Sequence, residues 1–261
     1  MRIAVGIEYD GAGFIGWQSQ DHGRTVQQCV EAALGFVADE NISLQCAGRT
    51  DTGVHAIHQV AHFDTSAERQ PHSWAFGANS RLDADANVLW AREVADEFHA
   101  RFSATGRAYR YVILNRPVRS ATLARKVAWE CRPLDMDSMQ HAATLLVGEH
   151  DFSAFRSVGC QAKSPVRRIN HLTLTRSGDY LVIDVHANAF LQHMVRNIVG
   201  VLLEIGIGKQ PVEWSAEVLE MRDRTLGGVT APAEGLYLVQ VDYPVAFNIP
   251  LPQSLQWPLC L

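Results

Sequence analysis

Cys46-Ala47-Gly48-Arg49-Thr50-Asp51-Thr52-Gly53-Val54-His55 is the stretch around which the rest of this 261-residue chain can be arranged. An alternating apolar run at residues 42–46 leads into it, and a second apolar run follows at residues 60–63. Two glycines bracket an arginine, two threonines and an aspartate, which suits a loop between two strands. Taken alone, this local chemistry favours a surface turn with a solvated aspartate. Other segments are needed to show whether the loop has a function.

The composition is that of an ordinary globular protein with a sizeable core, with 47% apolar and 20% charged residues. The longest apolar stretches are shorter than a membrane span and no basic-then-apolar leader opens the chain, so we expect no membrane partner. The five cysteines are scattered and form no CxxC pair. This usage predicts a cytoplasmic protein with reduced thiols.

Charge is distributed unevenly along the chain. The net charge of −5 argues mildly against a nucleic-acid partner, because such proteins are usually basic. Residues 101–132, however, contain eight basic side chains and a single acid, Glu130. A basic stripe on an acidic body can still bind phosphates locally, although a solvated arginine-rich surface explains the same pattern.

The first half of the chain alternates strand and helix patterns. Alternating apolar residues predict a strand over residues 3–9, and the Thr25–Gln28 spacing predicts a capped helix that continues to residue 37. Further patterns predict a strand into the Asp51 loop, a strand that ends near residue 63, a helix from Pro71 to Arg81 and a strand over residues 88–94.

The second half repeats this alternation. Residues 107–114 predict a strand, and Asp135 can cap a helix whose apolar face reaches Val147. We expect a long loop over residues 153–168 and then a hairpin around Gly178. Helices over residues 191–205 and 211–221 and a last strand over residues 236–241 complete the pattern.

This order of elements predicts the α/β (α+β) class. We expect two related α/β halves that share one mostly antiparallel central sheet, with helices on one side. The expected N-terminal half covers residues 1–105 and the C-terminal half residues 106–243. Residues 244–261 form a proline-containing tail that we expect to run over the surface.

Eight segments, in order along residues 3–243, together resemble the TruA family of tRNA pseudouridine synthases. They are Gly6–Gly11, Gly16–Gln18, Ala47–Asp51 with Gly53–His55, Phe98–Ala104, Tyr109–Tyr111, Asp151–Ser153 with Phe155–Arg156, Ala187–Phe190 with His193–Ile198, and Ala233–Leu238. One such segment would say little, but the ordered series is specific to the family.

The resemblance implies the pseudouridine synthase fold and the isomerisation of uridine to pseudouridine. The implied substrate is the tRNA anticodon stem-loop, modified at positions 38, 39 and 40. The resemblance also implies a homodimer in which each tRNA touches both subunits. It further implies a reaction that needs neither a metal nor an organic cofactor.

The resemblance assigns the reaction to Asp51, which would either attack the sugar covalently or remove a sugar proton on a glycal route. A buried carboxylate stays ionised when a cation lies close, and Arg196 matches the family's partner for this carboxylate. Tyr109 resembles the tyrosine that stacks on the bound uracil, and Leu236 resembles an apolar wall against the base. Thr52 departs from the alanine that many family members carry.

Further residues match positions that contact tRNA in the family. Arg49 resembles the residue that helps to hold the flipped-out base, and Arg69 matches another contact position. The two contact segments are Phe98, His99, Ala100, Arg101 and Phe102, and Gly159, Cys160, Gln161, Ala162 and Lys163. Arg101 and Lys163 supply charge for phosphates, so we expect these segments to position the RNA rather than to read its sequence.

Two other functions are compatible with parts of the sequence. His55, His58 and His62 have a spacing that could indicate a zinc hydrolase, but no HExxH glutamate is present and in a strand His55 would face away from the other two. We therefore expect no metal. A non-catalytic RNA-binding module would give Asp51 no role, and the enzyme is favoured because Asp51, Tyr109 and Arg196 match the family together.

Overall fold

The computed structural model describes residues 1–252, and the chain divides into two compact units. Unit 1 comprises Met1–Thr105 together with the described residues 237–252, and unit 2 comprises Gly106–Leu236. The second unit thus ends at residue 236 rather than at the expected residue 243. The reason is that strand β10 (Leu236–Asp242) pairs in parallel with β3 (His55–Asp64), a strand of unit 1.

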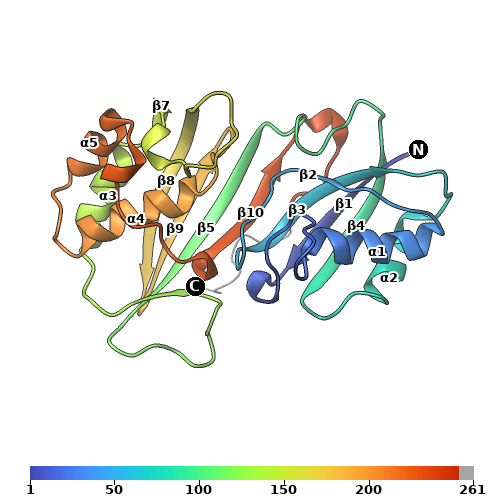
Figure 1. Ribbon diagram of the computed structural model, residues 1–261, viewed down its shortest axis with the longest axis horizontal. Helices are drawn as coiled ribbons and strands as arrows, with labels where there is room; N and C mark the ends of the chain where they lie inside the picture. The colour runs from blue at the N-terminus through green and yellow to red at the C-terminus, as the bar shows by residue number, and fades with distance from the viewer. Residues whose placement is uncertain (253–261) are drawn as a thin grey trace. The chain divides into compact units, whose positions relative to one another are not determined.

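Unit 1 is built on four neighbouring strands in the order β4-β1-β3-β10. The new elements are β1 (Arg2–Tyr9), β2 (Gln45–Cys46), β4 (Ala86–Val94), α1 (Val26–Ala38) and α2 (Pro71–Asn79). β1 is antiparallel to both of its neighbours, β3 and β4, and the short β2 is antiparallel to β3. Figure 1 shows β10, in red, beside β3, although the two strands are far apart in sequence.

Local sequence signals explain where α1 forms. Thr25 has extended backbone angles, and its side chain accepts a hydrogen bond from the Gln28 N–H, which confirms the predicted cap. Val30 and Leu34 are fully buried on the inner face of the helix. Beside α1, helix α2 begins at Pro71 as predicted and buries Trp74 against Phe63 of β3, with ring centroids 5.3 Å apart.

Unit 2 pairs four strands in the order β5-β9-β8-β7, all antiparallel. Its elements are β5 (Gly106–Asn115), β6 (Ala128–Glu130), β7 (Gly148–Asp151), β8 (Val166–Ser177), β9 (Tyr180–Ala187), α3 (Met136–Thr144), α4 (Met194–Gly206) and α5 (Trp214–Met221). Only β6 runs parallel to its partner, β5, among the described pairs of this unit. The predicted class, two α/β halves with mostly antiparallel strands, is confirmed.

Several boundaries in unit 2 differ from the sequence-based expectation. α4 begins at Met194 rather than at residue 191, because His193 has a positive φ of 63° that no right-handed helix contains. α3 ends at Thr144, so Val147, expected in its core face, is exposed. The sequence analysis also missed β6 and β7, which are short and lack clear alternation.

Residues 243–252, the described part of the chain after β10, pack partly on unit 1 and are partly exposed, and the rest of the expected tail lies outside the described residues. Phe247 lies edge-on to buried Phe98, with ring centroids 5.2 Å apart, and the Pro250 carbonyl oxygen is 2.9 Å from His58 Nε2. Val245 is 94% exposed, which agrees with a surface path at that point. Within residues 1–252, no helix combines the length and the apolar character that crossing a membrane requires.

Candidate active site

The residues that the family resemblance singles out divide between the two units. Unit 1 carries Arg49, Asp51, Arg69 and the segment 98–102. Unit 2 carries Tyr109, the segment 159–163, Arg196 and Leu236. Asp51 and Arg49 lie together in one loop, whereas the tyrosine and arginine predicted to work with Asp51 belong to the other unit.

The loop that contains Asp51, residues 48–54, is tied at its start to the strand that follows it. The Ala47 N–H donates to the Val60 carbonyl oxygen (2.8 Å), and the fully buried Gln59 side chain donates through Nε2 to the Gly48 carbonyl oxygen (2.6 Å). The loop therefore starts from a fixed position on β3 and its neighbour β2.

The centre of the loop is tied to residues 15–17, which lie in the segment after β1. The Trp17 N–H donates to the Thr50 carbonyl oxygen (3.0 Å), and the Thr52 hydroxyl donates to the Ile15 carbonyl oxygen (3.0 Å). Gly16 has a φ of 108°, and a Cβ there would lie 2.8 Å from the Thr50 carbonyl oxygen. Asp51, between these anchored threonines, is half-buried. A carboxylate in this position is held by its backbone while its side chain stays accessible.

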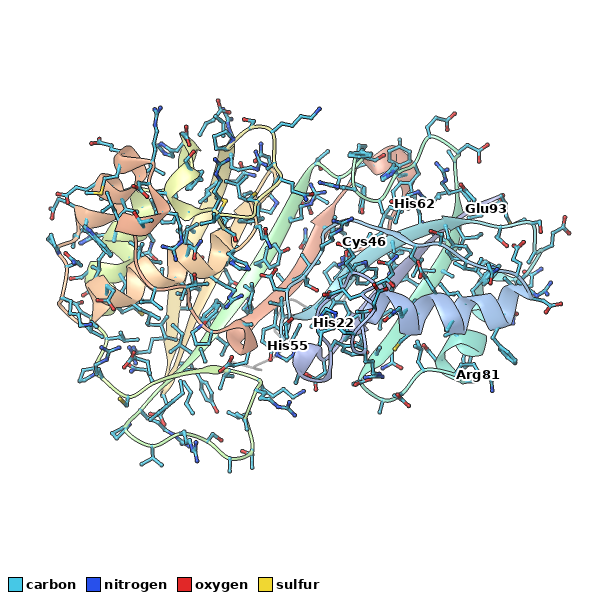
Figure 2. The ribbon with its side chains drawn as sticks, viewed as in Figure 1. His22, Cys46, His55, His62, Arg81 and Glu93 are labelled. Carbon is cyan, nitrogen blue, oxygen red and sulfur yellow. The ribbon has the colours of Figure 1, made fainter. Side chains whose placement is uncertain are left out.

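The end of the loop is held by His55, the first residue of β3, which is 2% exposed. The Gly11 N–H donates to His55 Nδ1 (3.0 Å), and Asp10 Oδ1 lies 3.0 Å from the same nitrogen. The His55 ring stacks on Tyr237 with centroids 4.5 Å apart. His55 and His62 lie near opposite ends of β3 in Figure 2, so they have separate surroundings.

A second predicted contact segment, residues 98–102, is organised by His62. Burial lowers the pKa of His62 to about 4, helped by His99 and Arg2, so the ring is neutral at pH 7 and its Nδ1 accepts a hydrogen bond from the Ala100 N–H (3.1 Å). Phe98 and Ala100 are fully buried, whereas Phe102 is 75% exposed. The exposed side chains of this segment are thus those of Arg101 and Phe102.

Two of the predicted RNA-contacting arginines act on one thiol. Burial raises the pKa of Cys46, and the nearby charges of Arg49 and Arg101 oppose this rise. Arg69 has a different environment, because its Nε donates to the Val37 carbonyl oxygen (3.1 Å) in the last turn of α1.

In unit 2, Tyr109 lies on β5 opposite Val185 of β9. It is 9% exposed, and its ring is edge-on to Phe190 with centroids 5.1 Å apart. Two residues further along β5, the buried Tyr111 hydroxyl donates to the Pro232 carbonyl oxygen (2.8 Å). This bond fixes the segment that leads to Leu236, which is also buried.

Arg196 lies in the first turn of α4, where its Nε donates to the Ala231 carbonyl oxygen (2.7 Å) and its carbonyl oxygen accepts from the Ala231 N–H (3.1 Å). Burial raises the pKa of Tyr111, with Glu234 adding to the rise and Arg196 opposing it. The Arg196 guanidinium is therefore held between the chain before Leu236 and the Tyr111 side of β5.

The second of the two predicted contact segments, residues 159–163 of unit 2, is largely exposed to solvent. Gly159 and Lys163 are exposed, and a Cβ at Gly159 would meet no atom within 4 Å. The Cys160 N–H donates to the Ser157 carbonyl oxygen (3.0 Å). This geometry suits side chains that reach outward to a ligand rather than a packed pocket.

The histidines that could suggest zinc do not form a cluster. His55 stacks on Tyr237, His58 faces Trp90, and His62 lies beside His99. Across residues 1–252, no group of three or more His, Cys, Asp or Glu side chains has the arrangement of a metal site.

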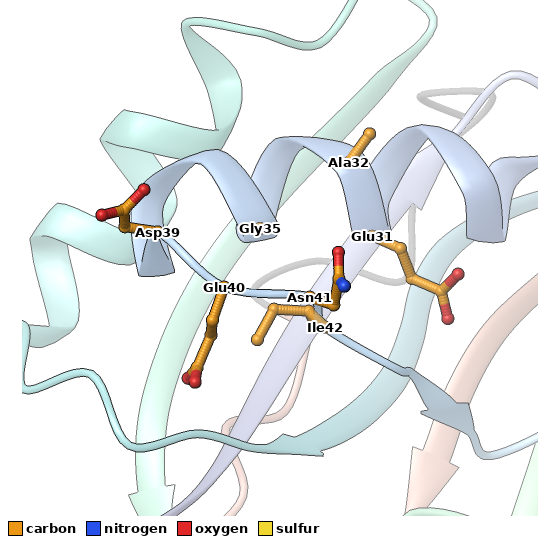
Figure 3. A pocket seen from close by; sticks show the side chains of 7 residues that line it. All are labelled: Glu31, Ala32, Gly35, Asp39, Glu40, Asn41 and Ile42. Carbon is orange, nitrogen blue, oxygen red and sulfur yellow. The ribbon is translucent and has the colours of Figure 1, made fainter.

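An acidic hollow at the end of α1, shown in Figure 3, also has a structural explanation. Glu31 accepts a hydrogen bond from the Leu44 N–H (2.8 Å), and Glu40 accepts one from the Ser66 N–H (2.9 Å). The Thr65 hydroxyl and the Ser66 groups lower the pKa of Glu40. Both carboxylates therefore fasten neighbouring backbone.

The sequence analysis missed the residues that hold the Asp51 loop. Tyr9, Gly16 and Trp17 lie in segments that resemble the family, but the resemblance alone gave them no role. Gln59 also lacked a role, and the one signal available was a polar residue in a strand that otherwise reads as buried.

Comparison with known proteins identifies the family of this chain. The family described as "tRNA pseudouridine synthase" matches residues 6–103 and 142–244. A tRNA pseudouridine synthase A from Nitrosococcus oceani is 57% identical over 250 residues, which are 96% of each chain. The proteins of that name from Hydrogenovibrio crunogenus (54%, 95% of each chain) and Pseudomonas aeruginosa (55%, 95% of this chain and 88% of the relative) are similarly close. The chain belongs to the tRNA pseudouridine synthase family.

Proposed function

We propose that this protein isomerises uridine to pseudouridine at positions 38, 39 and 40 of the tRNA anticodon stem-loop, with Asp51 as the reacting carboxylate. The observation that carries the proposal is a half-buried aspartate in a loop held at both ends and at its centre, in a chain about as long as relatives named tRNA pseudouridine synthase A. The family membership supports the reaction, and the anchored loop supports Asp51 as the residue that carries it out.

The reaction breaks the C1′–N1 bond, turns the uracil ring and forms a C1′–C5 bond. The electron pair of the broken bond leaves with the uracil, which returns a pair from C5 to C1′. The C5 proton is then lost and N1 gains one, so no oxidant or group donor is needed. Asp51 either bonds to C1′ and is later displaced, or removes a sugar proton that is later returned.

Unit 2 is proposed to supply the groups that face the base. In this proposal Tyr109 stacks on the uracil and relays the C5 proton, Leu236 forms an apolar wall, and Arg196 keeps Asp51 ionised. Two features support the proposal: the ring of Tyr109 is fixed edge-on to Phe190, and Arg196 is anchored on Ala231.

The remaining assignments concern the RNA backbone. Arg49 is proposed to hold the flipped-out arrangement, and Arg69 and the segments 98–102 and 159–163 to contact tRNA. Within residues 98–102 the exposure of Arg101 and Phe102 supports contacts through these two side chains. We further propose a cytoplasmic homodimer in which each tRNA touches both subunits.

The test is incubation of the purified protein with tRNA transcripts labelled in uridine, followed by nucleoside analysis and mapping of the modified positions. The proposal predicts pseudouridine at positions 38–40 without added metal or cofactor. No pseudouridine, or pseudouridine confined to other positions, would contradict it. Sedimentation of the protein with and without tRNA tests the dimer in the same preparations.

A further inference from the structure

The Asp51 loop has a support that its backbone hydrogen bonds do not include. Tyr9, the last residue of β1, is 4% exposed, and its hydroxyl oxygen lies 2.8 Å from Thr50 Oγ1. Thr50 is 8% exposed and directly precedes Asp51. A buried contact between two side-chain hydroxyls, 41 residues apart in sequence, thus lies one residue from the reacting carboxylate.

The Tyr9 hydroxyl is itself held in place. The Tyr9 ring packs edge-on to Phe14 (centroids 6.5 Å apart) and at an angle to Trp17 (6.0 Å). Trp17 also donates its backbone N–H to the Thr50 carbonyl oxygen. Residues 9–17 therefore hold Thr50 by two hydrogen bonds, one to its side chain and one to its backbone.

We propose that Tyr9 and Thr50 form a positioning pair that sets where the Asp51 carboxylate stands during the reaction. The inference rests on the proposed function of Asp51. Asp51 leads on from Thr50 and is followed by Thr52, whose hydroxyl is bonded to Ile15. With both neighbours fixed, the Asp51 backbone has little freedom, and a carboxylate that must reach one sugar atom depends on such placement.

Substitutions that remove only a hydroxyl group can distinguish a positioning role of this pair from a packing role. Tyr9→Phe removes the hydroxyl and keeps the ring. Thr50 Oγ1 then loses a buried hydrogen-bond partner, while the contacts of the ring with Phe14 and Trp17 remain. Thr50→Val keeps the shape of Thr50 and removes its hydroxyl, whereas Thr50→Ser keeps the hydroxyl. A positioning role depends on the hydroxyl pair, and a packing role depends on the ring and the methyl group.

The test measures single-turnover pseudouridine formation at saturating tRNA, together with KM and thermal unfolding. Tyr9→Phe and Thr50→Val should each lower the saturated rate by about tenfold or more, since small misplacement of a reacting group is costly. KM for tRNA should stay within about twofold, because no RNA contact is removed. Thr50→Ser should retain the wild-type rate, and the double variant should be no slower than the slower single variant, because the two hydroxyls act as one unit.

Ser215→Ala is the matched control, because Ser215 is fully buried in unit 2 and donates its hydroxyl to the Ala142 carbonyl oxygen (2.9 Å). It should lower the unfolding temperature and leave the rate unchanged. The inference is overturned if Tyr9→Phe turns over at the wild-type rate, or if Ser215→Ala slows the saturated reaction as much. A wild-type protein that forms no pseudouridine would instead overturn the proposed function, and this inference with it.

Discussion

Two loops of this protein that we assign to the same function are built in opposite ways. In unit 1, the Asp51 loop (residues 48–54) is hydrogen-bonded to β3 at its start and to residues 15 and 17 at its centre, and it ends at the buried His55, whose ring accepts a hydrogen bond from the Gly11 N–H. In unit 2, the predicted contact segment at residues 159–163 is open. Val158 beside it is 95% exposed, and Gly159 has free space around it.

The difference follows from what each loop is proposed to hold. A carboxylate that reacts with one carbon atom has to stand at a defined position, and misplacement by about 1 Å can lower a rate by about a hundredfold. A cation that contacts a phosphate acts over a longer distance and tolerates movement. We therefore expect the Asp51 loop to be intolerant of added atoms and residues 159–163 to respond mainly to a change of charge.

Among the substitutions that test this comparison, Gly16→Ala should have the largest effect on the reaction rate. Gly16 has a φ of 108°, and an added Cβ would lie 2.8 Å from the Thr50 carbonyl oxygen. Backbone strain of this kind costs about 1–3 kcal/mol. Relief of the contact would displace Asp51, so we expect the single-turnover rate to fall by about a hundredfold. Urea unfolding and rapid-quench nucleoside analysis measure the two quantities.

Gly178→Ala is the control for strain alone, because Gly178 also has a positive φ, 54°, but has open space around it. It should lower the free energy of unfolding and leave the single-turnover rate unchanged. Similar rate losses in both variants would mean that general strain, and not the contact with Thr50, explains the result.

Lys163→Glu tests the open loop by reversing one charge. We expect weaker tRNA binding, a salt dependence of log K that is shallower by about 0.7–0.9 for each phosphate that the protein no longer neutralises, and an unchanged rate at saturating tRNA. Binding titrations at several salt concentrations measure this. Lys209→Glu changes another exposed lysine of unit 2, one paired with Glu204 (3.2 Å), and should leave the slope as it is. An unaltered slope for Lys163→Glu would remove this segment from the RNA surface.

The segment 98–102 is less constrained than the Asp51 loop and less open than residues 159–163. Because His62 holds it, the free energy of unfolding should depend on pH. His62 has a folded-state pKa of about 4, below its ordinary value of 6.5. Between these values the unfolded chain takes up a proton that the folded protein does not, so the free energy of unfolding should fall as the pH drops through this window. His62→Gln should flatten that dependence. Urea titrations between pH 7 and 4.5 test this, and identical slopes in the two proteins would be the contrary outcome.

Gly159→Ala should have the smallest effect. A methyl group at this position meets no neighbouring atom, and the backbone there has no positive φ. We expect the free energy of unfolding to change by less than about 0.5 kcal/mol. A large loss of stability or activity would show that this segment is as constrained as the Asp51 loop and would end the comparison.

The sequence predicted those parts of the fold that local signals specify. Thr25 is predicted as a helix cap from its spacing to Gln28 and Asp135 from its place before an apolar helical face, and both side chains accept hydrogen bonds from the first turns of their helices. The hairpin around Gly178 was also predicted. The start of α4 was not, because no pattern of apolar residues reports a left-handed conformation at His193.

The candidate site was proposed from resemblance, since the local composition around Asp51 favoured an ordinary surface turn. Its supports could not be predicted from local patterns. Tyr9 reaches Thr50 across 41 residues, and Gln59 reaches back 11 residues to Gly48. Such contacts depend on which strands become neighbours, and strand periodicity reports that a residue is buried but not what it touches.

Replacement of Asp51 by asparagine tests the central claim most directly, because the amide keeps the shape of the side chain and removes its charge and nucleophilicity. We predict that Asp51→Asn forms no detectable pseudouridine at positions 38–40 while its affinity for tRNA stays within about threefold of wild type. Turnover at the wild-type rate by this variant would contradict the assignment of the reaction to Asp51.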